Sequence, residues 1–133
     1  MLEIPATLFD AMVQHAQAES PAECCGLLAG TGMVVTHRFG LRNELCSPIA
    51  YNADPRDLFE AFREMRHGGL DLLAIYHSHP RSPARPSRVD LAENYYGEMP
   101  RIIISLAGDE PVVKAFRLFD DYFEDLPYIR RAN

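Results

Sequence analysis

The chain contains the stretch LDLLAIYHSHP at residues 70–80, and this stretch decides how the remainder can fold. Leu70 to His77 is nearly continuous in apolar side chains, which is typical of a central strand buried on both faces of a sheet. Alternate residues of a strand point to the same face, so His77 and His79 can present their imidazoles together. The sequence therefore predicts a rigid central strand that carries a pair of histidines at its end.

The segments on both sides predict a sheet flanked by helices. The expected helices span residues 5–19, 54–68 and 87–96, the last two with Asp54 and Ser87 as N-caps. Strands are expected at 22–29 and 33–41, joined by a turn at residues 30–32, and at 101–106 and 111–118. The mixed tail, 120–133, is expected to pack on the body. Interleaved helices and strands predict an α/β (α+β) fold with a single mixed sheet.

Length and composition predict one domain covering residues 1–133. Hydrophobic residues make up 47% of the chain and charged residues 24%, as in ordinary globular proteins. The net charge of −6 argues against nucleic acid or an anionic membrane as a partner. The three cysteines form no CxxC pair, and neither a signal-like N-terminus nor an apolar run of about 18 residues is present, which predicts a reduced, cytoplasmic protein.

His77, His79 and Asp90 are candidate ligands of a divalent metal ion. Two imidazoles and a carboxylate leave one position of a tetrahedral zinc site open for water, as in catalytic rather than structural sites. Asp90 lies in the first turn of the expected third helix, where the helix N-terminus favours an ionised carboxylate. Because zinc can lower the pKa of a bound water to about 7, the set predicts a hydrolytic centre.

Glu23 and Ser87 are candidate catalytic residues beside these ligands. Glu23 stands among small and apolar residues, where a charged side chain needs either a task or a partner, and it could serve as the general base. Ser87 lies three residues before Asp90 on the same side of the expected helix. Its hydroxyl could donate a hydrogen bond to the oxyanion that forms on a scissile carbonyl.

These five residues at this spacing resemble the signature of the JAMM (MPN-plus) metalloproteases. Residues 21–28, PAECCGLL, are similar to the glutamate-bearing segment of the short bacterial members. The resemblance covers essentially the whole chain and implies a fold related to the cytidine deaminases. It also implies one zinc ion held by His77, His79 and Asp90, with Glu23 as general base and then acid and Ser87 at the oxyanion.

The resemblance further implies a substrate class. Eukaryotic deubiquitinating members carry long insertions, whereas here Asp90 leads through one helix directly into the strand that begins at Arg101. Short bacterial relatives are associated with ubiquitin-like sulfur carriers that end in Gly-Gly, from which they trim a tail or release cysteine. The implied protein is a zinc peptidase or isopeptidase acting on such a carrier.

Each candidate residue also has a structural explanation. A lone His-x-His pair is weak evidence for metal, Asp90 could simply answer the helix dipole, and Ser87 could serve only as an N-cap. Glu23 could instead neutralise a buried arginine. Cys24 and Cys25 are explained as small buried apolar residues.

Two other functions stay open at this stage, a small-molecule metal amidohydrolase and a non-catalytic interaction module. Deaminases of the related fold favour a PCxxC zinc motif, which the chain lacks. Non-catalytic members of the fold usually lack one or more ligands, whereas all are present here. Arg81, Arg85 and Arg88, which crowd the segment between His79 and Asp90, are interpreted as solvated loop charges or as contacts to an acidic carrier.

Overall fold

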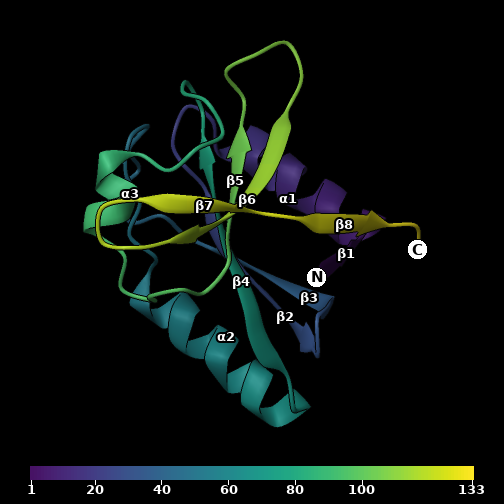
Figure 1. Ribbon diagram of the computed structural model, residues 1–133. Helices are drawn as coiled ribbons and strands as arrows, with labels where there is room; N and C mark the ends of the chain where they lie inside the picture. Colours follow the sequence, from purple (N-terminus) through teal and green to yellow (C-terminus); the bar gives the residue numbers. More distant parts are fainter.

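The computed structural model describes residues 1–133 as one eight-stranded sheet with three helices (Figure 1). The helices are α1 (Ala6–Glu19), α2 (Pro55–Gly68) and α3 (Arg88–Ala92). The strands are β1 (Leu2–Pro5), β2 (Cys25–Thr31), β3 (Val34–Leu41), β4 (Asp71–His79), β5 (Arg101–Ser105), β6 (Val112–Leu118), β7 (Phe123–Leu126) and β8 (Tyr128–Arg131). The expected α/β class with a single mixed sheet is confirmed.

The sheet is built around β4, in the order β7-β6-β5-β4-β2-β3-β1-β8. β4 pairs antiparallel with β2 and parallel with β5, so both of its edges are hydrogen-bonded. Six consecutive residues at its C-terminal end, Ala74 to His79, are buried. The prediction of a central, doubly covered strand from the apolar run is therefore confirmed, and the histidines stand on a rigid support.

The two faces of the sheet are covered by different helices. α1 packs on one face, where Met12 and Ala16 contribute to a core that includes Tyr76 and Ile102. α2 covers the opposite face, and there Met65 packs with Ile75 and Leu27. Because side chains alternate along β4, the residues Ile75, His77 and His79 all point toward the α2 face.

The long helix that precedes β4 follows its local signals closely. Asp54 caps α2 by accepting a hydrogen bond from the backbone N–H of Arg56 at 2.8 Å, as the sequence predicts. Gly69 ends the helix with φ of +66°, the left-handed conformation that glycine adopts without strain.

The helix is not long and apolar enough to cross a membrane, and neither is any other helix of the structure.

Some expected boundaries of secondary structure are wrong, and one strand was not expected. The third helix ends at Ala92 rather than residue 96, because Asn94 turns away to bond Leu118 and Arg101, and Tyr95 is 83% exposed. Residues 30 and 31 belong to β2, so the hairpin turn starts only at Gly32. β1 was not predicted, since its pairing with β8 is a contact between distant parts of the chain.

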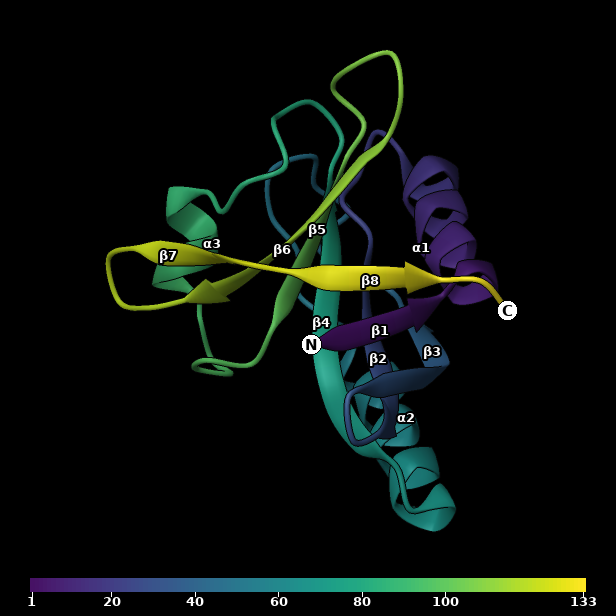
Figure 2. The ribbon, with the colours of Figure 1, turned by 45° about the vertical axis from the view of Figure 1, so that its right-hand side comes forward.

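The C-terminal tail forms the two outermost strands of the sheet. β7 and β8 are separated only by Pro127, yet they occupy opposite ends of the strand order. Figure 2 shows them as one yellow band that crosses in front of the other strands. Tyr128 packs against the α1-side core and its hydroxyl donates to the Val113 carbonyl at 2.7 Å, which confirms that the tail packs on the body.

Gly26 of β2 is required by the ring of Tyr76, its partner residue in β4. A Cβ atom at position 26 would overlap the Tyr76 ring, which is fully buried and held by His15 and Arg38 through its hydroxyl. We expect Gly26→Ala to lower the free energy of unfolding by about 2 kcal/mol, measured by urea denaturation. Gly108→Ala, where the added Cβ meets only ordinary contacts, should change it by less than about 0.5 kcal/mol. Equal stability of the two variants would contradict the overlap.

Candidate metal centre and active site

The C-terminal end of β4 carries the two imidazoles to one point. His77 and His79 are each 2% exposed, and their Nε2 atoms lie 3.1 Å apart. His77 is paired with Cys25 of β2 and with Ile103 of β5, so its backbone is fixed on both sides. The spacing of two residues along a strand thus places both rings on the same face, as predicted.

α3 brings the third group, the carboxylate of Asp90. Ser87 and Asp90 form a capping box, in which Ser87 Oγ accepts from the Asp90 N–H at 3.1 Å and Asp90 Oδ2 accepts from the Ser87 N–H at 2.9 Å. The carboxylate held in this way lies with Oδ1 3.1 Å from His77 Nε2 and Oδ2 3.1 Å from His79 Nε2. The predicted N-cap and the predicted ligand therefore form one local structure.

The three side chains could hold a metal ion. Their ligand atoms all lie within 4.8 Å of one another. A tetrahedral zinc ion with bonds of about 2.0–2.2 Å places its ligand atoms about 3.3–3.5 Å apart, so contacts of 3.1 Å need to open by only a few tenths of an ångström. Nitrogen and carboxylate donors with this separation match the ligand set of a catalytic zinc site.

The environment favours a neutral His77 and an ionised Asp90, which are the states that metal ligands need. Burial lowers the pKa of His77, which favours the neutral imidazole. The pKa of Asp90 is held well below its usual range because, against the effect of burial, hydrogen bonds from both imidazoles favour the carboxylate. Against burial again, the hydrogen bonds with Asp90 and the Pro83 carbonyl raise the pKa of His79. His79 therefore tends to keep a proton in the metal-free protein, and a metal ion bound by this group would displace that proton.

Neighbouring groups fix the orientation of both imidazoles. His79 Nδ1 lies 2.9 Å from the Pro83 carbonyl, a partner that fixes this nitrogen as the donor and leaves Nε2 free to bind. The ring of Tyr51 stacks on His77 with centroids 4.8 Å apart and an interplanar angle of 28°. His77 Nδ1 is buried without a hydrogen-bond partner.

Glu23 is positioned near the histidines by hydrogen bonds between Ser78 and Cys24, the residue that follows Glu23. The Cys24 N–H donates to Ser78 Oγ at 2.7 Å, and the Ser78 N–H donates to the Cys24 carbonyl at 3.1 Å. Glu23 itself precedes β2 and does not lie within a strand, contrary to expectation. Its N–H donates to the Ser47 carbonyl at 2.8 Å and its carbonyl accepts from Asn43 Nδ2 at 3.0 Å, so a loop holds its backbone instead.

The carboxyl group of Glu23 is buried and has an oxygen without a hydrogen-bond partner. The residue is 3% exposed, and its Oε1 atom has no hydrogen-bond partner. Burial raises its pKa to about 8, with His79 acting in the opposite direction and Asp90 in the same one. A carboxyl group with a pKa close to neutrality and a free oxygen beside the histidines is suited to accept and return a proton.

The interpretation of Glu23 as the partner of a buried arginine is wrong. The buried arginine is Arg101, which is 4% exposed, and it forms no ion pair with Glu23 or any other carboxylate. Its Nη2 donates to Asn94 Oδ1 at 2.5 Å, and its guanidinium lies 5.9 Å from the centre of the Tyr96 ring.

Three residues around the site were not found from the sequence: Asn43, Tyr51 and Arg101. Asn43 and Tyr51 belong to the irregular segment after β3, which offers no periodic pattern from which a contact could be predicted. Asn43 is a polar residue that is only 8% exposed. Its side chain donates a hydrogen bond to the Glu23 carbonyl and in this way organises the segment. Arg101 gave a signal that could have been used, because a charged residue opens an otherwise apolar strand.

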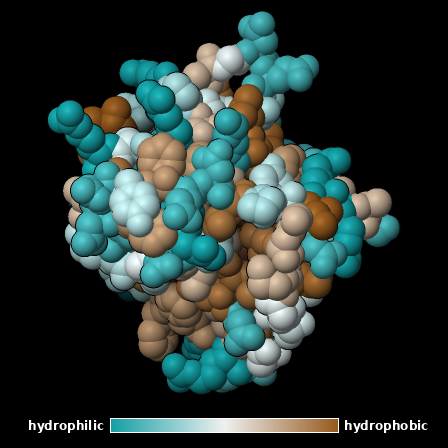
Figure 3. All heavy atoms as spheres, viewed as in Figure 1, coloured by the Kyte–Doolittle hydropathy of each residue, from teal (hydrophilic) through white to brown (hydrophobic).

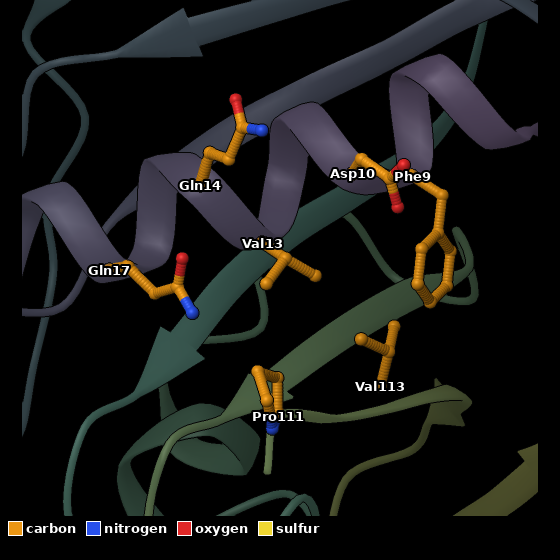
Figure 4. Close-up of a pocket in the computed structure, with 7 residues that line it drawn as sticks. All are labelled: Phe9, Asp10, Val13, Gln14, Gln17, Pro111 and Val113. Atoms are coloured by element: carbon orange, nitrogen blue, oxygen red, sulfur yellow. The ribbon is translucent and has the colours of Figure 1, made fainter.

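A groove lies away from these residues, on the α1 face of the sheet. Figure 4 shows this open groove between α1 and the start of β6. It has a volume of about 380 Å³ and is lined by Phe9, Asp10, Val13, Gln14, Gln17, Pro111 and Val113. None of the candidate catalytic residues lines it, and the histidines point to the opposite face.

The sheet topology and the His77, His79 and Asp90 group place the chain among the JAB/JAMM domains, whose named relatives include peptidases. The chain belongs to the Prok-JAB family, the prokaryotic homologues of the JAB domain, whose family model matches residues 5–119. The resemblance drawn from the sequence is thereby confirmed.

Individual relatives agree with this assignment. The chain is 40% identical over 119 residues to the probable TtuB-protein conjugate cleaving protease of Thermus thermophilus, covering 89% of this chain and 76% of that protein. It is 38% identical over 93 residues to the CysO-cysteine peptidase of Mycobacterium tuberculosis, covering 68% of this chain and 64% of the relative. The solution structure of a Desulfitobacterium hafniense protein is similar with a TM-score of 0.91 and 33% identity, over 100% of this chain and 94% of that one.

Replacing the carboxylate of α3 should weaken metal binding specifically. We expect Asp90→Ala to reduce zinc affinity by more than about 100-fold, since even changes outside the ligand set cost 10–100-fold. Competition with a chromophoric chelator measures the affinity. Glu93→Ala, an exposed acid at the end of the same helix, serves as the matched control and should bind zinc as the wild type does. Unchanged affinity in Asp90→Ala would remove Asp90 from the ligand set.

The raised pKa of Glu23 predicts a pH dependence of stability in metal-free protein. A carboxyl group whose pKa is about 8 in the folded protein, against an ordinary value of 4.5, stabilises the fold below about pH 4.5 and loses this contribution as the pH rises through about 8. Glu23→Gln removes the titration, so the stability difference between the two proteins should shift across this window in favour of the variant. Urea unfolding in the presence of chelator measures it, and parallel pH profiles would contradict the burial argument.

Proposed function

We propose that this protein is a zinc-dependent peptidase or isopeptidase that hydrolyses the bond after the C-terminal Gly-Gly of a ubiquitin-like sulfur carrier. The observation that carries the proposal is the buried Glu23 carboxyl group, with an unpartnered oxygen, beside the His77, His79 and Asp90 group. A metal set alone would suit storage or structure, whereas a proton acceptor next to it suits hydrolysis.

The ligand set supports zinc as the metal, with one ion per chain. His77, His79 and Asp90 supply two nitrogens and one carboxylate, which leaves a position open as catalytic zinc sites require. When bound there, zinc would supply the Lewis acidity that polarises a carbonyl oxygen and lowers the pKa of water.

The residues of the chain then divide the proton transfers between them. Glu23 accepts the proton of the attacking water at its carboxylate and donates it to the nitrogen of the departing amine. Ser87 Oγ already accepts the N–H of Asp90, so its own hydrogen is free to be donated to the oxyanion on the scissile carbonyl. Burial of Glu23 keeps its pKa close to neutrality, which suits a group that must do both.

The names of the relatives support a protein conjugate as the substrate. One relative is named for cleaving TtuB-protein conjugates and another for hydrolysing a CysO-cysteine adduct. Both names describe a substrate in which one protein is joined to a second molecule, which the proposed hydrolysis would release as an amine. The same chemistry covers trimming a peptide tail and releasing cysteine from a carrier.

Two alternatives are less well supported. A non-catalytic interaction module would have no need for the complete His-His-Asp group and the adjacent buried glutamate. A small-molecule amidohydrolase would share the proton transfers but not the cleavage of a protein tail. Incubation of the zinc-loaded enzyme with a carrier that bears a C-terminal extension, followed by mass spectrometry, tests the proposal. Cleavage after Gly-Gly supports it, and an intact carrier would refute it.

Glu23→Gln should separate catalysis from metal binding. The variant keeps the size and most of the polarity of the side chain but cannot accept a proton, so we expect the cleavage rate to fall by about 100-fold or more while zinc content stays at one per chain. Glu64→Gln on the exposed face of α2 is the matched control and should retain full activity. Activity of Glu23→Gln comparable with the control would overturn the assigned role.

A further inference from the structure

Three exposed arginines lie in the segment between His79 and Asp90, two of them in the loop between β4 and α3 and one at the start of α3. These are Arg81, Arg85 and Arg88, which together are called the arginine rim here. No ion pair of the structure involves any of them, and none of their side chains forms a hydrogen bond within the chain. In a chain with a net charge of −6, this is a concentration of unpaired positive charge in the segment that joins two of the candidate ligands.

The loop that carries the rim is firmly held. Ala84 is 7% exposed and packs with Ile103 and Phe116, so the backbone between Arg81 and Arg85 is anchored in the core. Ser105 Oγ donates to the Ser82 carbonyl at 2.6 Å, which adds a second anchor from β5. Prolines at 80, 83 and 86 restrict the backbone further.

The rim is connected to the metal group itself. The Pro83 carbonyl that fixes His79 also accepts the N–H of Arg85, at 2.8 Å, so the arginine and the ligand share one anchoring atom. Arg88 is the first residue of α3, where a basic side chain gains nothing from the helix dipole. Neither packing nor helix stability therefore accounts for these charges.

We propose that the arginine rim is the docking surface for the folded body of the substrate protein, and that it binds an acidic surface next to the Gly-Gly tail. This inference rests on the proposed function, since it concerns the substrate of the same site. The backbone that carries the unpaired guanidinium groups is held in place, the planar guanidinium loses little freedom per hydrogen bond to a carboxylate, and its charge attracts an anionic partner from a distance. Docking at the rim would place the tail within reach of the metal group, because the rim lies in the anchored segment that joins His79 to Asp90.

An acidic protein fits the observations better than nucleic acid does. A nucleic-acid surface is normally a broad basic face, whereas the rim is a local cluster on an acidic molecule. The face of the molecule in Figure 3 is a mixture of hydrophilic and hydrophobic side chains, with no single character over its whole extent. On such a surface, the local positive charge of the rim orients an acidic partner and raises the rate at which the two proteins associate.

Charge reversal tests the proposal. The double variant Arg81→Glu/Arg85→Glu is compared with Arg63→Glu/Arg66→Glu, which makes the same change of net charge on exposed, unpaired arginines of α2. The probe is the full-length ubiquitin-like sulfur carrier that the wild-type enzyme cleaves. Association is followed by stopped-flow fluorescence in low and high salt, and zinc content and thermal unfolding confirm that both variants are folded.

We expect the rim variant to associate about tenfold more slowly at about 50 mM salt, with a much smaller difference at about 500 mM salt, because the interaction is screened. KM for the carrier should rise in parallel, and the α2 control should behave as the wild type does. A carrier whose acidic residues nearest the tail are changed to lysine should lose binding to the wild type and regain it with the rim variant.

The outcomes distinguish this inference from the proposed function. If the wild type cleaves the carrier and both variants associate at its rate, the docking role of the rim is overturned while the peptidase proposal stands. If the wild type neither binds nor cleaves any carrier, the proposed function fails and the docking role fails with it. Tighter binding of a single-stranded oligonucleotide than of the carrier would also overturn the inference.

Discussion

The paired hydrogen bonds between Cys24 and Ser78 are the constraint on which the site depends. Ser78 lies between the two histidines, and its side chain and backbone both bond the residue that follows Glu23. One contact therefore aligns a loop from before β2 with the end of β4. A shift of one residue in this register would turn both imidazoles to the α1 face of the sheet. The same strand register therefore forms the fold and positions the site.

Much of the fold could be predicted because its signals are local. The apolar run of β4, the cap at Asp54 and the glycine at the end of α2 each act through neighbouring residues, and each is confirmed. Prediction failed where distant contacts decide the structure. α3 is cut short by bonds from Asn94 to Leu118 and Arg101, and β1 exists because β8 lies beside it.

The candidate site shows the same division. The clustering of His77, His79 and Asp90 could be predicted because strand alternation and a capping box fix the directions of these side chains within short segments. The groups that hold them in place could not be predicted. Tyr51 reaches His77 from a segment without regular structure, and Asn43 positions the backbone of Glu23 through a side-chain bond that no periodicity indicates.

The passage of the chain from β7 through Pro127 into β8 also bears on solubility. An open sheet normally has two edge strands, each offering unpaired backbone groups to another molecule. Here both edges belong to one short segment that is interrupted by a residue without an N–H. Charged side chains at Glu124, Asp125, Arg130 and Arg131 make the edges still less suited to pairing. The sheet thus leaves little template on which copies could add to one another and form fibres.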